Sequence, residues 1–150
     1  MVNKFLSIVF CNILLVLPVK AELLIINVQK ENGKGPIIIV AYNSEKKEFF
    51  GKGKPNKKGN PDHIFMVKRK YMENTKLTFT FDIPFGEYSF LAFLDNDNNE
   101  MLSANFIGIP KEPFGFSNNA RGKFGPPKWD DALVNFTKRN QKISINLKGL

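Results

Sequence analysis

The chain of 150 residues carries a formal net charge of +8 and contains one cysteine, Cys11. This length suits a single domain with its own apolar core. A lone cysteine excludes an internal disulfide framework, so the stability of the fold must come from packing.

The first 21 residues have the three parts of a secretory signal peptide. Lys4 supplies the positive start, an apolar run follows, and Val19 and Ala21 are the small residues at positions −3 and −1 of a cleavage site. The apolar run of about 15 residues is shorter than the ~20 that a membrane-spanning helix needs, which argues against the alternative of a membrane anchor. We therefore expect residues 1–21 to be removed. Residues 22–150 should form one soluble domain without a membrane span, in the periplasm or outside a bacterial cell.

The basic charge has several possible partners. Loss of Lys4 and Lys20 with the signal peptide lowers the net charge from +8 to +6. The densest lysine cluster, within residues 46–58, is rich in Gly and also holds Phe49 and Phe50, which is typical of a solvated loop with an apolar anchor. Because export also removes most nucleic acids, we expect no nucleic-acid partner. A surface of anionic lipid or polysaccharide stays open as an alternative.

Short apolar or alternating stretches predict seven strands, which are residues 23–28, 37–43, 64–69, 77–81, 88–94, 132–136 and 143–147. The first two flank a turn signal and should pair antiparallel. The second is apolar on both faces and should be central, whereas the strict alternation of the fourth predicts one buried face. The last two should form a closing hairpin. This pattern predicts an all-β fold, a single antiparallel β-sandwich of immunoglobulin-like or transthyretin-like type.

A turn precedes the fifth predicted strand. Pro84 fixes φ at the first turn position, and Gly86 permits a positive φ. Tyr88 then begins the strand as in a tyrosine corner, so its hydroxyl should reach back to the preceding loop.

One long structured loop, residues 93–129, lies between the fifth strand and the closing hairpin and is too long for a simple connection. Its side chains Asp95, Asp97 and Asn99 are spaced two apart, as in calcium-binding loops, and Asn105 could complete a shell of oxygen ligands. The pattern is imperfect, because Glu100 and Phe106 replace the Gly and Glu of such loops. The alternative is a network of Asx turns, in which these side chains accept bonds from their own backbone N–H groups.

The second half of the loop alternates aromatic residues with Gly and amides. We expect its aromatic side chains to form a small satellite core under the loop, a group that comprises Phe106, Phe114, Phe116, Phe124 and Trp129. Because amide and guanidinium groups offer several donors in fixed geometry, Asn118, Asn119 and Arg121, with Trp129 beside them, are candidates for binding a carboxylate or a sugar.

Residues 84–132 resemble the DUF2141 family of exported bacterial proteins, in the runs PFGEYSFLAFLDNDNN and NFIGIPKEPFGFSNNARGKFGPPKWDDA. The resemblance extends more loosely over nearly all of residues 22–150 and implies a β-sandwich module of unknown function. In that family the acidic loop runs D-x-N-x-N-G-x-L-D-x-N. Glu100 and Ser103 depart from this pattern, which makes calcium binding less expected here than in relatives.

The sequence contains no recognisable catalytic constellation. His63 is the only histidine and lies in a loop, and no cysteine follows Cys11. We therefore expect a non-enzymatic binding or interaction module that uses the 93–129 loop and takes a carbohydrate, a peptide or an envelope component. Calcium is the one candidate cofactor. The alternatives are a hydrolase that uses loop carboxylates and a purely structural envelope protein.

Overall fold

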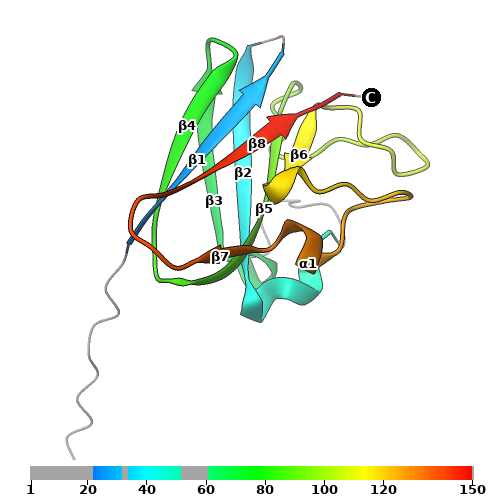
Figure 1. Cartoon of the computed structure of the whole chain (residues 1–150). Coiled ribbons are helices and arrows are strands. Elements are labelled where there is room, and N and C mark those ends of the chain that lie inside the picture. Colours follow the sequence, from blue (N-terminus) through cyan, green and yellow to red (C-terminus); the bar gives the residue numbers. More distant parts are fainter. Residues whose placement is uncertain (1–21, 32–33, 52–60, 150) are drawn as a thin grey trace, which may run out of the picture.

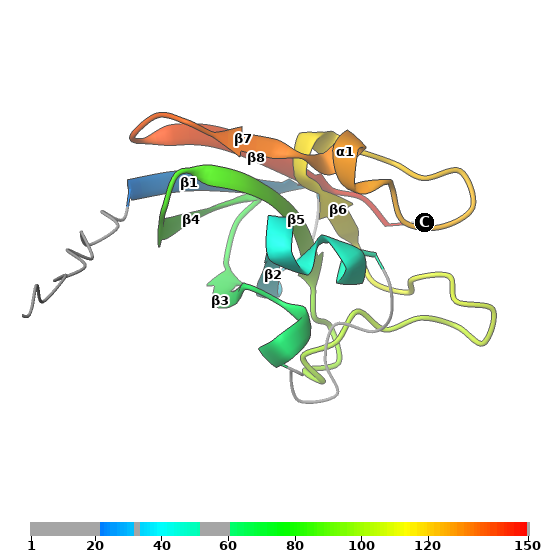
Figure 2. The same cartoon turned by 90° about the horizontal axis from the view of Figure 1, so that it is seen from below.

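The computed structural model describes residues 22–31, 34–51 and 61–149, where the chain folds into two β-sheets that pack face to face (Figures 1 and 2). The first sheet has the order β4-β1-β8 and consists of β1 (Glu22–Lys30), β4 (Lys76–Ile83) and β8 (Gln141–Leu147). The second has the order β3-β2-β5-β6, with β7 also paired to β5, and consists of β2 (Gly35–Asn43), β3 (Met66–Met72), β5 (Gly86–Leu94), β6 (Phe114–Phe116) and β7 (Val134–Phe136).

In the described part of the chain, four short helical segments connect the strands, namely η1 (Ser44–Phe49), η2 (Pro61–His63), η3 (Ser117–Asn119) and α1 (Trp129–Ala132). No helix in the described ranges is long and apolar enough to cross a membrane. The predicted all-β sandwich is confirmed, with β6 as a strand that was not expected inside the long loop. The predicted signal peptide lies outside the described residues.

Two predicted strand pairings are wrong. β1 pairs antiparallel with β4 and parallel with β8, whereas β2 pairs antiparallel with β3 and β5. The first two strands therefore lie in different sheets. The predicted closing hairpin is also absent, since β7 pairs with β5 and β8 with β1. In both places the two successive strands belong to different sheets.

The main core lies between the two sheets. From the first sheet it receives every second residue of β1 and β4, such as Leu24, Ile26 and Phe79, which are fully buried. From the second sheet it receives Ile37 and Ile39 among others. The alternation predicted for the fourth strand is confirmed, and one face of the first sheet is in water.

The two central strands of the second sheet, β2 and β5, are buried on both faces. The outward side chains of β2 and β5, including Ile38, Val40 and Phe93, belong to a second apolar cluster. Phe50, at the end of η1, and Phe116 from the long loop pack on this cluster. The prediction that the second strand is central is therefore confirmed, and the long loop helps to cover the outer face of its sheet.

The tyrosine corner is confirmed. Tyr88 donates a hydrogen bond of 3.0 Å from its hydroxyl to the carbonyl oxygen of Pro84. The predicted apolar anchor is confirmed as well, since Phe50 is buried and meets the Tyr42 ring edge-on.

The sheets are joined at both sides of the sandwich. On one side Phe114 of β6 and Lys148, just after β8, exchange two backbone hydrogen bonds of 3.1 and 3.0 Å. On the other side the edge strands β3 and β4 are joined by ammonium groups, because Lys68 and Lys70 donate to backbone carbonyls of β4. Each of these lysines also lies over a phenylalanine ring of β4. Such contacts occupy strand edges that would otherwise be open to pairing.

Candidate functional site

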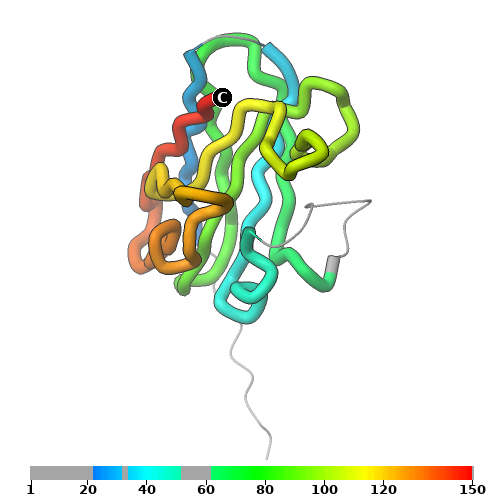
Figure 3. The backbone as a smooth tube through the Cα atoms, turned by 90° about the vertical axis from the view of Figure 1, so that its right-hand side faces the viewer, coloured from blue at the N-terminus to red at the C-terminus, as the bar shows by residue number. Residues whose placement is uncertain are grey.

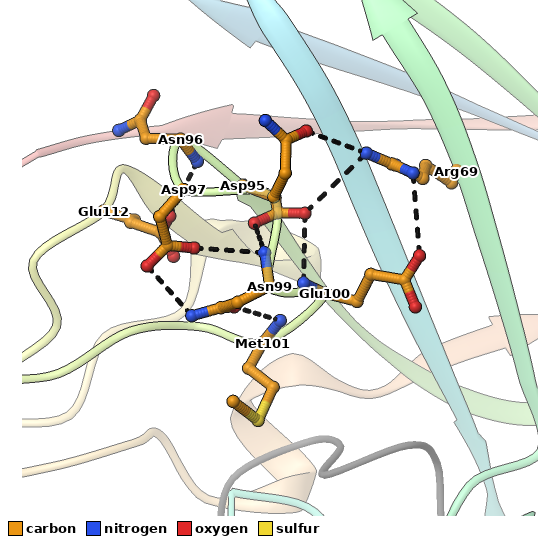
Figure 4. A network of polar contacts seen from close by, with 9 residues as sticks. Arg69, Asp95, Asn96, Asp97, Asn99, Glu100, Met101 and Glu112 are labelled. Atoms are coloured by element: carbon orange, nitrogen blue, oxygen red, sulfur yellow. Dashed lines mark hydrogen bonds and ion pairs between the residues drawn. The ribbon is translucent and has the colours of Figure 1, made fainter.

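The acidic turn that follows β5 is an ordered network of hydrogen bonds (Figure 4). The Asp95 carboxylate accepts bonds from the backbone N–H groups of Asn99, at 3.0 Å, and Glu100, at 3.2 Å. Asp97 accepts from the backbone and the side chain of Asn99, and Asn99 accepts from the N–H of Met101 at 2.7 Å. These are the Asx-turn hydrogen bonds that the sequence predicts as one alternative, and calcium binding stays a prediction.

Glu112 completes the network from the far side of the loop. Its two carboxylate oxygens accept backbone bonds from Asn96, at 2.7 Å, and Ser103, at 2.9 Å. Glu112 is buried, and Asp95 is fully buried. The two carboxylates thus hold both ends of the acidic turn against the end of β5.

Arg69 of β3 balances part of this charge. Its guanidinium lies 4.0 Å from Asp95 and 3.6 Å from Glu100, and it donates a 3.0 Å bond to the side chain of Asn98. Asn98 and Glu100 both adopt positive φ, 56° and 61°. Asn tolerates that backbone conformation, whereas Glu does so at a cost.

Three carboxylates meet at this point. Asp95, Asp97 and Glu112 each offer an oxygen atom, and these oxygens lie within 4.8 Å of one another. Each carboxylate oxygen has more than one acceptor direction, so the hydrogen bonds do not use all of its capacity. Such an all-oxygen group suits a hard cation such as Ca²⁺. Asp95 and Glu112 are buried, so this pair of carboxylates is poorly placed to flank a substrate as in a hydrolase.

Of the four metal-ligand candidates from the sequence, three lie in the acidic turn and one lies in the next turn. Asp95 and Asp97 lie in the carboxylate group, and Asn99 is hydrogen-bonded to Asp97. The side-chain oxygen of Asn105 instead accepts from the N–H groups of Ile107 and Ile109 in the next turn. Glu112 was missed, although it is the only acidic residue between Glu100 and Asp130.

The four ligand-binding candidates make contacts within the domain. Asn118 donates to the carbonyl of Leu133 at 2.8 Å, and Asn119 accepts from the N–H of Asn146 at 2.8 Å. Arg121 lies over the Phe114 ring, and Trp129 meets the Phe50 ring edge-on. Their role in ligand binding stays a prediction, and each also ties the loop to the sandwich.

The predicted satellite core is confirmed for part of the aromatic set and wrong for the rest. Phe116 is buried, and Phe114 and Trp129 pack against the second cluster. Phe106 and Phe124, however, are 97% and 103% exposed. These two rings stand at turns near Gly108 and Gly125, and a Cβ added to either glycine would meet no atom within 4 Å.

Two tips of the long loop therefore expose apolar groups. The first tip (residues 104–110) carries Phe106, Ile107 and Ile109, and the second tip (residues 121–126) carries Phe124. Together they hold four of the seven large hydrophobic side chains that are exposed among the described residues. Scattered exposed apolar residues are ordinary, whereas these four are concentrated at two turns of one loop.

A shallow hollow of about 430 Å³ lies elsewhere, at the end of the first sheet. Lys30, Lys76 and Lys148 line it together with Glu31 and neighbouring polar residues. Burial lowers the pKa of Lys30. Among the described residues, its lining has one carboxylate, that of Glu31, and neither histidine nor cysteine.

Comparison with known proteins gives one relationship. No curated protein and no solved structure matches the chain. A family model does match, over residues 25–144, and its description reads "uncharacterized protein conserved in bacteria". These residues run from within β1 to within β8, and they include the acidic turn and both tips. The chain therefore belongs to the DUF2141 family.

Proposed function

We propose that the protein is a non-enzymatic binding module of the bacterial envelope, and that the 93–129 loop is its contact surface. The bacterial setting is supported by the family description, and the envelope by the predicted signal peptide. The single observation that carries the proposal is the near-complete exposure of Phe106 and Phe124 on a loop whose base is hydrogen-bonded to the sandwich.

The base of the loop is built for order. The acidic turn is fixed by backbone donors to Asp95 and Glu112, and the segment around Ser117 is fixed to the sandwich. The Ser117 hydroxyl accepts from the N–H of Phe90 at 3.0 Å and donates to the carbonyl of Ala132. An ordered loop loses little conformational entropy on binding, which favours a partner for its exposed tips.

The proposal predicts binding that depends on the tips. Every described strand lies within residues 22–149, so a chain that starts at Glu22 contains both sheets and both cores. We expect this chain to co-sediment with a bacterial envelope preparation. The Phe106→Ser, Phe124→Ser double variant should stay in the supernatant with an unchanged melting temperature, since neither ring packs in the fold.

Tyr71→Ser is the matched control, because Tyr71 is also an exposed aromatic residue but lies on β3. It should bind like the wild type. If the wild type does not co-sediment, or if the double variant binds as well as Tyr71→Ser, the proposed function is wrong.

A separate proposal concerns the acidic turn. We propose that Ca²⁺ binds the oxygens of Asp95, Asp97 and Glu112, supported by their mutual separation of at most 4.8 Å. A ligand of the folded state alone raises the melting temperature. Millimolar calcium should then raise it relative to EDTA, and the rise should be absent in Asp97→Asn. Asp97 is the suitable position because it is exposed, whereas loss of Asp95 would unfold the turn itself. An equal midpoint with calcium and EDTA would exclude the ion and leave the Asx turns as the whole explanation.

A further inference from the structure

We propose that the two tips dock the protein on an anionic lipid bilayer. This inference rests on the proposed function and names the partner of the same surface. It predicts that Phe106, Ile107 and Phe124 enter the interfacial region of the bilayer while neighbouring cationic side chains contact the lipid head groups.

The charge of the tips is complementary to such a surface. The first tip is followed by Lys111, and the second tip contains Arg121 and Lys123 and is followed by Lys128. Residues 104–111 and 120–128 together hold these four cations and no acidic residue. The buried carboxylates lie at the base of the loop and not at its tips. Cationic groups next to exposed apolar groups are the combination that binds anionic membrane surfaces.

The arrangement of the tips fits a plane. Figures 1 and 2, which differ by a quarter turn, both show the segments around residues 105 and 124 projecting from the same side of the sandwich. Figure 3 looks at this side and shows the two segments apart from each other, facing the viewer. Two separate segments that project from one side can enter a flat, deformable surface together.

Both tips are already ordered. In the first tip the Asn105 side chain accepts from two backbone N–H groups, and the backbone of Asn105 also donates to Ile109 at 2.8 Å. In the second tip Gly122 lies so close to the carbonyl groups of Gly125 and Pro126 that a Cβ would collide with them. Close contacts within each tip therefore constrain its backbone, which lowers the entropic cost of insertion.

A protein partner fits these features less well. The rings stand on two separate convex turns, whereas the centre of a protein interface is a contiguous, closely packed patch. A second copy of the chain would also bring the four cations of one tip pair against those of the other. An anionic bilayer can take up two separate apolar side chains, and its negative head groups attract the four cations.

The test is co-sedimentation of the chain that starts at Glu22 with two kinds of vesicle. We expect binding to vesicles of phosphatidylethanolamine with phosphatidylglycerol and little binding to phosphatidylcholine alone. Phe106→Ser and Phe124→Ser should each reduce binding by about tenfold or more, because each removes a side chain that would be buried. Tyr71→Ser should bind like the wild type.

Charge is tested by a matched pair of double variants. Lys123→Gln with Lys128→Gln should weaken binding and its dependence on salt, whereas Lys46→Gln with Lys47→Gln, on η1, should change neither. Equal loss in both pairs would mean a nonspecific attraction of the whole cationic protein and would overturn the inference.

Two other outcomes would also overturn it. Tip-dependent binding to the envelope preparation without binding to anionic vesicles would identify a protein or polysaccharide partner, and would leave the proposed function standing. A wild-type dimer that the Phe106→Ser, Phe124→Ser variant converts to a monomer would identify a second copy as the occupant. Failure with both the envelope preparation and the vesicles would remove the proposed function itself.

Discussion

At the scale of single residues, Glu100 is strained where a glycine would be relaxed. Its φ of 61° lies in the left-handed region, which costs a residue with a Cβ about 1–2 kcal/mol. Glu100→Gly removes this cost, and the contact that it gives up is the exposed ion pair with Arg69, which is worth about 0–1 kcal/mol. We expect the variant to be more stable by about 0.5–1 kcal/mol in urea unfolding.

Glu100→Ala is the control, because it also loses the carboxylate but keeps the Cβ. It should be no more stable than the wild type. Should Glu100→Gly prove less stable than Glu100→Ala, the backbone strain at Glu100 would be smaller than the conformational freedom that glycine gains in the unfolded chain.

The buried tyrosine Tyr42 predicts a stability loss in alkali. Burial raises its pKa from 10.0 to about 12. The folded state therefore holds a proton that the unfolded state releases between these values, so the contribution is complete below about pH 10 and is lost as the pH rises through 12. A difference of two units corresponds to about 2–3 kcal/mol. Urea midpoints from pH 9 to pH 12 should fall less steeply in Tyr42→Phe than in the wild type, and parallel curves would contradict the assignment.

Some of the site was predictable residue by residue. Side chains spaced two apart, as in Asp97 and Asn99, hydrogen-bond to backbone only two residues away, so a local pattern is sufficient. Glu112 meets the same turn from a distant point of the chain, which no local spacing reveals. The prediction that Phe106 and Phe124 are buried was wrong, because it followed from their aromatic character. The nearby glycines indicate exposed turns instead.

At the scale of elements, the seam between β6 and β8 needs a glycine. A Cβ on Gly115 would lie 2.5 Å from the carbonyl oxygen of Asn146 and 3.0 Å from the Ile145 side chain. Gly115→Ala would push the strands apart and strain the bonds between Phe114 and Lys148. We expect a loss of about 1–3 kcal/mol in unfolding free energy.

Gly149→Ala is the matched control for this seam, since its Cβ would meet only Pro113, at 4.0 Å. It should change the unfolding free energy by less than about 0.5 kcal/mol. Equal effects of the two substitutions would show that the close approach at Gly115 is not what holds the seam.

Burial was more predictable than pairing at this scale. The alternation in β4 and the apolar run in β2 report correctly whether one face or both are covered. A turn sequence such as Glu31–Pro36, however, is needed equally for a hairpin and for a crossing between sheets. The partner of β1 depends on contacts with β4 and β8, which are remote in sequence, so local signals predicted the wrong neighbour.

At the scale of the whole molecule, the long loop has two parts with different physical roles. Its inner part is the loop without the two tips. This part packs on the outer face of the second sheet through buried and half-buried side chains such as Phe116 and Trp129. Its two tips leave the sandwich on one side and expose apolar and cationic groups (Figure 3). We propose that the inner part stabilises the sandwich and that the tips bind an anionic bilayer.

Hydrogen–deuterium exchange with and without anionic vesicles tests this claim most directly. In the free protein, peptides that contain the acidic turn and β6 should exchange slowly. On adding phosphatidylglycerol-containing vesicles, new protection should appear in peptides that cover residues 104–111 and 120–128, and nowhere on β3 or β4. Protection confined to the strand edges, or no change at either tip while the protein is bound, would contradict the account.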